Sequence, residues 1–415
     1  MGAFSIFSNK KKRDPSFELP EPELNYYEIL GRRMNKLKYI LLLGLLFFVI
    51  GGFTFYSDQL NVENFRYLLK FMSIDMDTEI ADGALIEFDA SPGTRALTVS
   101  GDLVICDSNG VQIFDKSGER FLRDRDFMND PMCVASGHNL LVCDCGSSTL
   151  NAYTVYARVY THNARYPIYG LCSSADTGRY AILTAAKGYR SGIEVYDPEF
   201  RKIFDFYFAD KYVSAIDISR DGAFAAACTV NNTQQGDYLS ELYIFDVTDP
   251  KNHRIHEFPG EIAWKVFFRA DGGYAVLTNG ALRLFGAEGD EKACVTFRSD
   301  TVKRFCFSQE VCALAFQTEG LSNGTTVVFY DEKLEKLSTA EYTGDVSRID
   351  IINGKAYIYS AGTLYTVDAA SGKETAREDA GPLYACAVAE PDSNMIILIY
   401  QGKAVFRSAG GRAAD

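Results

Sequence analysis

One short pattern recurs eight times between residues 111 and 408, and it limits the folds open to this chain more than any other feature. Each copy is an alternating strand, usually ending in Asp, followed by a polar turn, and successive copies begin 37 to 49 residues apart. The copies are VQIFD (Val111 to Asp115), LNAYT (Leu150 to Thr154), IEVYD (Ile193 to Asp197), LYIFD (Leu242 to Asp246), LRLFG (Leu282 to Gly286), VVFYD (Val327 to Asp331), LYTVD (Leu364 to Asp368) and AVFRS (Ala404 to Ser408). A blade of four strands needs about 40 residues and cannot bury both faces alone, so this period predicts an all-β fold, a β-propeller.

A second element recurs shortly before three of these copies. It is SADTGRYAIL at Ser174, SRDGAFAAA at Ser219 and RADGGYAVL at Arg269. We interpret it as the hairpin turn between the innermost and second strands, where Gly supplies a positive φ. The last repeat supplies only three strands, so Leu85 to Ala90 (LIEFDA) is expected to add the fourth and close the ring. This predicts eight four-stranded blades, with seven as the alternative because the second and eighth copies are the least regular.

An uncharged apolar segment precedes the repeats. Tyr39 to Tyr56 form an eighteen-residue stretch without a charge, roughly 27 Å long as a helix against a hydrocarbon core of about 30 Å. Four Lys or Arg residues between positions 32 and 38 precede it, and the first charges after it are acidic. The positive-inside rule therefore predicts a single-pass cell-membrane protein with a cytoplasmic N-terminus and an extracytoplasmic C-terminal part. A cleaved signal peptide is the alternative, but the leader is long and small residues are missing at its end.

The remaining boundaries follow from local composition. Residues 1–38 indicate a disordered cytoplasmic tail with a basic run at Lys10 to Arg13. The transmembrane helix is assigned to residues 39–56. Residues 57–80 contain NVENFRYLLKFM, whose apolar residues recur at helical spacing and predict an amphipathic stalk. The propeller is expected over residues 81–408, followed by a flexible C-terminus over residues 409–415.

The repeats resemble WD40-like and TolB-like propellers in their Ser-x-Asp-Gly hairpins. The Gly-His and Trp-Asp signatures of true WD40 units are missing, and Trp264 is the sole tryptophan. The chain is more similar to an uncharacterised family of membrane-anchored propeller proteins from Gram-positive, mostly clostridial, bacteria, a domain of unknown function. That resemblance is carried by the apolar segment with NVENFRYLL after it, KGYRSGIEVYD (Lys187 to Asp197), ADKYVSAIDIS (Ala209 to Ser219) and SELYIFD (Ser240 to Asp246). It implies the architecture and the membrane location, and it implies no activity.

Charge is distributed unevenly along the chain. The net charge is −13, and residues 1–38 carry eight Lys or Arg against five Asp or Glu, so the remainder carries −13 − 3 = −16. A surface of that sign repels phosphate backbones, which need a stripe of Lys and Arg to displace counterions. We therefore expect no nucleic-acid partner, and membrane contact only through residues 39–56.

Motifs that carry chemistry are largely missing. There is no His-Glu-x-x-His, P-loop or Gly-x-Gly-x-x-Gly sequence. One Gly-x-Ser-x-Gly match, Gly320 to Gly324, lies in a polar loop before a strand, where a nucleophile elbow does not form. His253 and His256 stand three apart in a predicted strand and so point to opposite faces. We expect no enzyme activity and no catalytic, cofactor or metal residues.

Ten cysteines and one acidic run are further candidate sites. Most of the cysteines lie in apolar strands and are expected to be free, buried thiols, among them Cys106, Cys172, Cys228, Cys306, Cys312 and Cys386. A thiol site formed by Cys133, Cys143 and Cys145 is the alternative, although no helix terminus or basic neighbour is expected to lower their pKa. The acidic run from Asp124 to Asp130 lacks the Gly and distal Glu of a calcium loop, so we interpret it as a polar turn between blades.

These features favour a non-enzymatic binding or scaffold module for an envelope protein or a cell-wall component, because propellers bind through loops and a central opening. The candidate loops are Thr229 to Leu239 and Gln317 to Thr325. The candidate partner-binding residues are Arg190, Lys211, Tyr212, Asn232, Asp237 and Tyr238. The alternative is an extracellular enzyme, or a receptor for a small molecule or glycan, in the central channel. An enzyme there would need clustered carboxylates with raised pKa values. A sensory function has the least support, because the tail contains no recognisable signalling domain.

Overall fold

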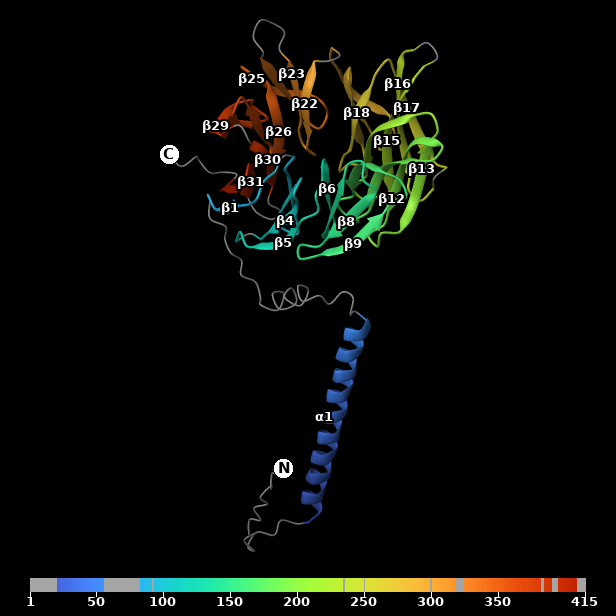
Figure 1. The fold of residues 1–415 in the computed structure, drawn as a ribbon, viewed down its shortest axis with the longest axis vertical. Coiled ribbons are helices and arrows are strands. Elements are labelled where there is room, and N and C mark those ends of the chain that lie inside the picture. Colours follow the sequence, from blue (N-terminus) through green and yellow to red (C-terminus); the bar gives the residue numbers. More distant parts are fainter. Residues whose placement is uncertain are drawn as a thin grey trace. The chain divides into compact units, whose positions relative to one another are not determined.

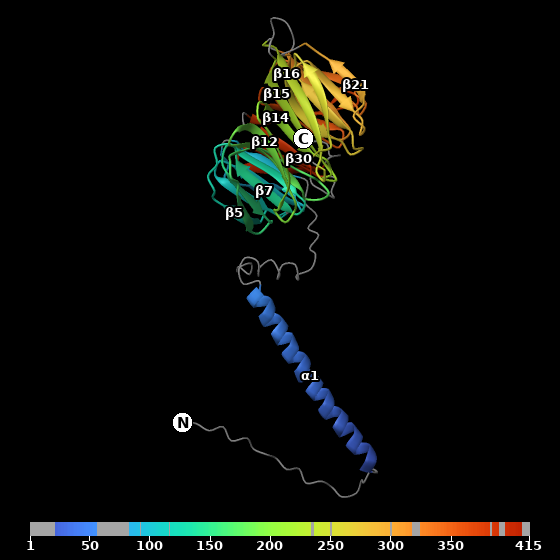
Figure 2. The same ribbon diagram turned by 90° about the vertical axis from the view of Figure 1, so that its right-hand side faces the viewer.

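The computed structural model describes residues 21–55, 83–91, 93–115, 117–233, 236–249, 251–298, 301–317, 324–381, 384–389 and 395–408. Its two compact units, residues 1–72 and residues 73–415, are treated separately. The predicted stalk over residues 57–80, the flexible C-terminus over residues 409–415 and most of the GLSNG loop lie outside the described residues. Figure 1 shows the fold, and Figure 2 shows it turned by 90°.

The first unit contains one helix, α1, over Glu21–Phe55. It begins well inside the region that we expected to be a disordered tail, and the acidic residues at positions 21 and 23 suit the positive end of a helix dipole. No helix in the described part of the chain meets the length and apolarity required of a membrane span. Side chains are described only as far as Phe47, so the predicted span over residues 39–56 extends beyond the described side chains.

The second unit consists of eight antiparallel four-stranded sheets around a common axis, so the predicted all-β propeller with eight blades is confirmed and the seven-bladed alternative is wrong. We number the blades 1 to 8 in chain order. The innermost strands of blades 1 to 8 are β2 (Arg95–Val99), β6 (Pro131–Ser136), β10 (Ile168–Ser173), β14 (Tyr212–Ile218), β18 (Ala263–Phe268), β22 (Val302–Phe307), β26 (Val346–Ile352) and β30 (Tyr384–Ala389). The second strands are β3 (Asp102–Asp107), β7 (Asn139–Asp144), β11 (Tyr180–Ala186), β15 (Phe224–Asn232), β19 (Tyr274–Thr278), β23 (Cys312–Gln317), β27 (Lys355–Ser360) and β31 (Met395–Tyr400).

The recurrent sequence pattern forms the third strand of every blade. These strands are β4 (Gly110–Phe114), β8 (Thr149–Tyr153), β12 (Tyr189–Tyr196), β16 (Tyr238–Asp246), β20 (Ala281–Phe285), β24 (Thr325–Tyr330), β28 (Thr363–Asp368) and β32 (Lys403–Ser408). The outer strands of blades 1 to 8 are β5 (Arg120–Asp124), β9 (Arg158–Asn163), β13 (Lys202–Phe208), β17 (His253–Pro259), β21 (Glu291–Thr296), β25 (Lys336–Tyr342), β29 (Glu374–Asp379) and β1 (Leu85–Glu87).

The Asp that ends most copies of the pattern caps the turn to the outer strand. In blade 6, Asp331 Oδ1 accepts the backbone N–H groups of Lys333 at 2.9 Å and Glu335 at 2.7 Å. In blade 3, Asp197 Oδ1 does the same for Glu199 at 3.1 Å and Arg201 at 2.9 Å. A short acceptor side chain at this position satisfies N–H groups that a tight turn would otherwise leave unpaired, which explains why the sequence repeats it.

The predicted turns between the first and second strands are also confirmed. Residues 174–179, 219–223 and 269–273 connect these strands in blades 3, 4 and 5. Gly178, Gly222 and Gly272 have φ values of 67°, 68° and 82°. Positive φ strains residues that carry a Cβ, so the Gly in each copy of the Asp- and Gly-containing turn has a structural cause.

The core is divided among the junctions between blades. Eight clusters of buried apolar side chains occupy these junctions, one at each. The junction of blades 3 and 4, for example, buries Ile193, Val195 and Phe245 completely. Figure 2 shows β14, β15 and β16 as successive strands of one blade, packed against the blade that contains β12. Each sheet therefore depends on both neighbours for the burial of its faces.

The ring is closed by strand exchange between the two ends of the domain. β1 pairs with β32 in antiparallel register, with Leu85 opposite Val405 and Glu87 opposite Lys403. This confirms that the segment beginning at Leu85 supplies the outer strand of blade 8. Ile86, at 4% exposure, packs in the cluster between blades 8 and 1, whereas Leu85 is 54% exposed.

Ring closure makes a direct prediction for stability. Ile86→Ala removes a buried side chain from the closing strand, and we expect it to lower the free energy of unfolding by about 2–4 kcal/mol. Leu85→Ala on the same strand is the matched control and should cost less than about 0.5 kcal/mol. Urea unfolding of the full chain in detergent micelles measures both changes. Equal losses for the two variants would contradict the closing role of Ile86.

Candidate functional site

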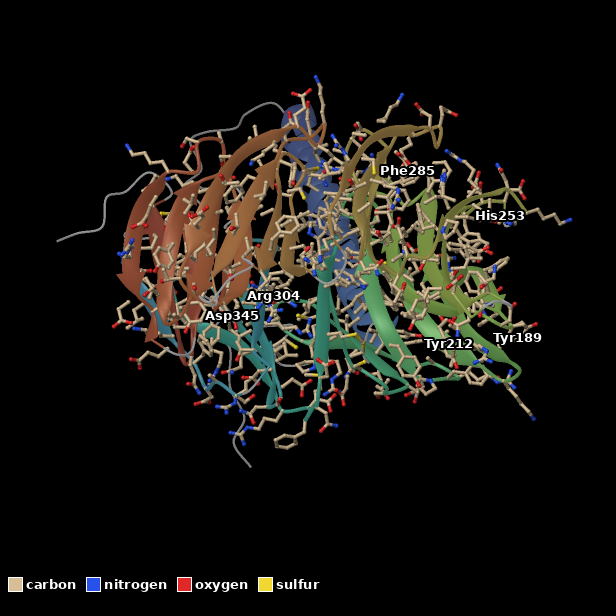
Figure 3. The ribbon with its side chains drawn as sticks, turned by 90° about the horizontal axis from the view of Figure 1, so that it is seen from above. Tyr189, Tyr212, His253, Phe285, Arg304 and Asp345 are labelled. Carbon is tan, nitrogen blue, oxygen red and sulfur yellow. The ribbon has the colours of Figure 1, made fainter. Side chains whose placement is uncertain are left out.

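The two ends of the ring differ in what they carry. One end, which we call the crossing face, carries the passages from each blade to the next, such as residues 209–211 and 260–262, and the hairpins between second and third strands. The opposite face carries the turns from first to second and from third to outer strands. Figure 3 shows both faces of the ring. The crossing face is marked by Tyr189, Tyr212, Arg304 and Asp345, and the opposite face by His253 and Phe285.

Three exposed tyrosines lie at strand starts on the crossing face of blades 3 and 4. Tyr189, Tyr212 and Tyr238 are 47%, 58% and 51% exposed, and each is the first residue of its strand. Together with Arg190 we call them the tyrosine patch. Exposed aromatic side chains beside an Arg are typical of the residues that dominate protein interfaces.

Contacts within blade 3 and between blades 3 and 4 hold Tyr189, Arg190 and Tyr212 in place. The Arg190 guanidinium lies 4.9 Å from the centre of the Tyr212 ring and donates to the Tyr212 hydroxyl. Tyr189 packs against Tyr207 with ring centroids 5.5 Å apart. Below them, Ser191 Oγ donates to the Lys211 carbonyl at 2.9 Å and accepts the Val213 N–H at 3.0 Å. The patch is thus built on strand ends with fixed neighbours.

All six predicted partner-binding residues lie on the crossing face, but their environments differ. Arg190 and Tyr212 are in direct contact. Asn232 and Tyr238 are opposite each other on the long hairpin of β15 and β16, and the Asp237 N–H donates to Thr233 Oγ1 at 3.2 Å. Residues 234–235 of this hairpin and residues 318–323 of the other candidate loop lie outside the described residues. Tyr189 was missed, although its place next to Arg190 at a strand start was a usable signal.

Lys211 turns inward instead of facing solvent. Its ammonium group forms an ion pair with Glu241, which is 6% exposed, and donates to the Tyr243 hydroxyl at 2.7 Å. Burial lowers the pKa of Lys211, but the bonds to Glu241 and Tyr243 outweigh burial and raise it. Lys211 therefore fixes the passage from blade 3 to blade 4, and the expectation that it faces a partner has no support from its geometry.

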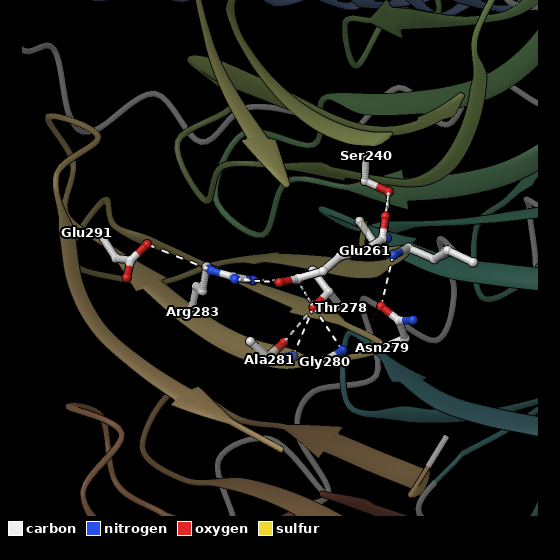
Figure 4. Close-up of polar contacts among 10 residues, drawn as sticks. Ser240, Glu261, Thr278, Asn279, Gly280, Ala281, Arg283 and Glu291 are labelled. Carbon is white, nitrogen blue, oxygen red and sulfur yellow. Dashed lines mark hydrogen bonds and ion pairs between the residues drawn. The ribbon is translucent and has the colours of Figure 1, made fainter. Parts of the chain in front are cut away.

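The passage from blade 4 to blade 5 is also fixed by an ion pair, but here the residue of the passage carries the negative charge (Figure 4). Arg283 of β20 donates to both oxygens of Glu261 in a bidentate pair, at 2.7 Å each. The Thr278 hydroxyl also donates to Glu261, and Ser240 Oγ donates to the Glu261 carbonyl at 2.9 Å. The side chains of Arg283 and Glu261 are only 16% and 22% exposed. Burial raises the pKa of Glu261, but the Arg283 and Thr278 hydrogen bonds outweigh it and lower that pKa.

The acidic run from Asp124 to Asp130 connects β5 of blade 1 to β6 of blade 2, which confirms the predicted turn between blades. Its carboxylates form ion pairs. Arg158 of blade 2 binds Asp124 at 2.5 Å and approaches Asp126 to 3.8 Å. Arg95 binds Asp130 at 3.1 Å. Among the described residues, no group of His, Cys, Asp and Glu is arranged to hold a metal ion.

The predictions for histidine and cysteine are largely confirmed. His253 lies against Phe245, with ring centroids 5.7 Å apart, while His256 Nε2 lies 2.7 Å from the Tyr274 hydroxyl, so the two point to opposite faces. All ten cysteines are free, and of the six named as buried, Cys172 and Cys306 are only partly buried. One expectation was wrong: contact with the Cys106 thiol lowers the pKa of Cys133, with a further contribution from Arg95.

The described inner strands carry two carboxylates, on different blades. Asp217 of blade 4 accepts the Phe268 N–H at 2.8 Å, and burial raises its pKa. Asp350 of blade 7 accepts the Ala387 N–H at 2.9 Å and pairs with Arg348 at 2.8 Å. Each therefore joins neighbouring blades, and the two do not form the carboxylate cluster that an enzyme in the central channel would need.

Comparisons with known proteins agree on the architecture. A family model described as "Family of unknown function (DUF5711)" matches residues 83–404. Similar solved structures include Sqt1 from Saccharomyces cerevisiae (TM-score 0.59, 9% identity, 79% of this chain and 99% of that chain). BamB from Moraxella catarrhalis is also similar (TM-score 0.54, 12% identity, 80% and 99%), as is the C-terminal WD40 domain of Sif2 (0.53, 11%, 79% and 97%). At such identities the likeness shows the fold alone. No curated protein matches the sequence.

The Glu261–Arg283 pair predicts a pH-dependent contribution to stability. Arg283→Met leaves the largely buried Glu261 carboxylate without its cationic partner, with only the Thr278 hydroxyl bonded to it, which should cost about 3 kcal/mol at pH 7. Because the folded pKa of Glu261 lies below its ordinary 4.5, the wild-type advantage is complete above that value and is lost as the pH falls through the folded pKa. Unfolding by urea at pH 7 and near pH 3 measures this difference.

The matched control for this prediction keeps the same arginine. Glu291 is 48% exposed and approaches Arg283 only to 3.9 Å, so Glu291→Gln should cost less than about 0.5 kcal/mol. A penalty for Arg283→Met that stays constant with pH would show that lost packing, and not the ion pair, accounts for the effect.

Proposed function

The chain belongs to the DUF5711 family of unknown function, and we propose that it is a membrane-anchored, extracytoplasmic binding module that engages an envelope protein through the crossing face of its propeller. The observation that carries this proposal is the tyrosine patch. Three half-exposed tyrosines and an Arg lie on the crossing face of two neighbouring blades, and the Arg190 guanidinium contacts Tyr212. Such side chains lose little conformational entropy on binding and supply most of the energy in many protein interfaces.

The pre-formed geometry supports a binding function in a second way. Two ion pairs fix the passages on either side of blade 4. Lys211, before blade 4, pairs with Glu241 of blade 4, and Glu261, after it, pairs with Arg283 of blade 5. A partner would therefore meet a surface that needs little reorganisation, which leaves more of the contact energy for affinity. A cell-wall component is the alternative ligand, and the experiments below separate the two.

The proposed location rests on the sequence. The uncharged segment over residues 39–56 follows a cluster of Lys and Arg residues and precedes an acidic domain. This is the charge asymmetry that the positive-inside rule associates with a cytoplasmic N-terminus. In the proposed arrangement the propeller stands outside the cytoplasmic membrane, where its net negative charge keeps it away from anionic headgroups.

A single exposed cysteine provides a test of this orientation. Cys294 is exposed, and the other nine cysteines are buried or partly buried. We expect a membrane-impermeant maleimide to label Cys294 in intact cells, and Cys294→Ser to abolish that labelling. Burial raises the pKa of Cys294, so labelling should accelerate from pH 7 to pH 8.5 as the thiolate fraction grows. Labelling that requires permeabilised cells would place the propeller in the cytoplasm.

The binding surface is tested by photo-crosslinking in native membranes. A photoreactive phenylalanine analogue replaces Tyr212 or Tyr238 on the crossing face, or Asp249 on the opposite face of the same blade. We expect one defined envelope protein to crosslink at the first two positions only. Tyr212→Ala should then weaken binding of that purified protein by about 10- to 30-fold, as expected for an interface hot spot.

The outcomes distinguish the two ligand classes. Crosslinks to polymeric wall material at position 212 or 238 would replace the protein partner by a cell-wall component. Equal crosslinking at position 249, or unchanged affinity for the Tyr212→Ala variant, would show that the tyrosine patch is not the binding surface.

A further inference from the structure

The inner strands carry a positive charge that the rest of the domain does not share. Over the eight inner strands the sequence places five cations and two carboxylates, a net +3, in a chain of net charge −13. Four of the cations stand on three consecutive blades, 5 to 7. They are Lys265 of β18, Lys303 and Arg304 of β22, and Arg348 of β26. Because inner strands border the central channel of a propeller, this part of the channel wall is basic.

The two carboxylates of the inner strands are already engaged. Asp217 accepts a backbone N–H and lies close enough to Lys265 for that charge to oppose the rise in its pKa. Asp350 pairs with Arg348, whose side chain nevertheless remains 50% exposed. Among the described residues, no carboxylate forms an ion pair with Lys303 or Arg304.

Arg304 is held in place by neutral groups. Its Nε donates to the Ser347 carbonyl of the neighbouring blade at 3.0 Å, and its Nη1 donates to the Lys303 carbonyl at 2.8 Å. A guanidinium has five N–H donors, so backbone carbonyls orient this one and leave further donors and the full charge for a ligand. Figure 3 shows Arg304 toward the middle of the ring, on the crossing face.

The ring is also least tightly joined at this place. Every other pair of neighbouring inner strands lies in close contact, and β18 and β22 approach each other least. Figure 1 shows the separation between them. Phe267 and Phe307 stack across this junction with ring centroids 5.8 Å apart, close to the opposite face. The strands are therefore tied near one end, and their crossing-face ends border the channel mouth.

Pairing is irregular at the crossing-face ends of blades 6 and 7, as it is in blades 3, 4, 5 and 8. The register between first and second strands shifts next to Lys303 in blade 6 and next to Ser347 in blade 7. Such a β-bulge turns a side chain away from its regular direction. Lys303, Arg304 and Ser347 are all exposed, and Phe305 is an exposed aromatic residue on an inner strand at 37%.

We propose that the channel mouth bordered by β18, β22 and β26 binds an extended acidic polypeptide segment of the partner, with Lys303, Arg304 and Arg348 contacting its carboxylates and Phe305 contacting an apolar side chain. Charge complementarity selects an anion, because the basic wall stands in an otherwise acidic domain. Phe305 is the next residue on β22, and its exposed ring favours a polypeptide over a phosphate-rich polymer, since a polymer of that kind offers no apolar side chain for the aromatic ring. This inference deepens the proposed function and rests on it for the identity of the partner, but its chemistry is tested separately.

The test uses defined peptides and the full chain in detergent micelles. The probe is a fluorescein-labelled peptide of sequence Glu-Glu-Phe-Glu-Glu-Phe-Glu-Glu, and the comparison peptide has Gln in place of every Glu. Fluorescence anisotropy should show the Glu peptide binding at least 10-fold more tightly, with affinity that falls as salt rises from 50 to 300 mM. The double variant Lys303→Glu/Arg304→Glu should lose at least 10-fold in affinity for the Glu peptide, and Arg304→Gln should lose a smaller part.

The matched control changes charge by the same amount elsewhere on blade 6. Lys333 and Lys336 are exposed at the opposite face, so Lys333→Glu/Lys336→Glu should alter affinity less than twofold. Equal losses in this control would reveal non-specific attraction and overturn the proposal, as would equal binding of the Gln peptide. Phe305→Ala should lower the affinity for the Glu peptide severalfold. If Phe305→Ala has no effect and inorganic polyphosphate of equal charge binds more tightly, the site takes a phosphate polymer and the peptide proposal is wrong.

The same experiment separates this inference from the proposed function. Peptide binding without any crosslinked envelope protein would contradict the proposed function alone, and a crosslinked partner without peptide binding would contradict this inference alone.

Discussion

No blade of this protein can bury its own faces, and the rest of the structure depends on that constraint. Each four-stranded sheet is apolar on both sides, and the buried clusters lie between sheets. The stability of a blade therefore comes from its neighbours. Because the ring has no free end once β1 joins β32, this mutual dependence runs around the whole domain, and the polar functions are left to strand ends, passages and inner strands.

The periodic part of the fold was predictable because it follows from local chemistry. The third strands, the Asp caps such as Asp331 and the turns at Gly178 and Gly222 recur with a regular spacing, and each has a short-range cause. Closure by the segment at Leu85 was also predictable, since counting strands in the last repeat leaves one missing. The start of α1 at Glu21 was not, because the charged and Pro-containing residues before the apolar segment indicated a disordered tail.

The candidate site was predictable in its position but not in its side-chain chemistry. Arg190 and Tyr212 stand 22 positions apart, and their contact depends on how blades 3 and 4 stack. The inward turn of Lys211 depends on Glu241, a residue of the third strand whose burial only the assembled sheet determines. The charge of the inner wall likewise becomes visible only when the inner strands are identified and counted together. Sequence patterns report periodicity within a blade, whereas these contacts are made between blades.

The strand exchange that closes the ring also constrains how the protein can be made. β1 lies at the beginning of the domain and its partner β32 at the end, so blade 8 and the junctions beside it cannot form until the last strand has emerged. Pairing across such a sequence distance is slow, because loop-closure entropy must be overcome before the contact forms. If the domain is exported, it reaches the far side of the membrane as an open row of blades with apolar faces at both ends. Its biogenesis then requires protection from aggregation and proteolysis during the interval before closure, and a nascent chain cut short in the last blade would leave the entire ring open.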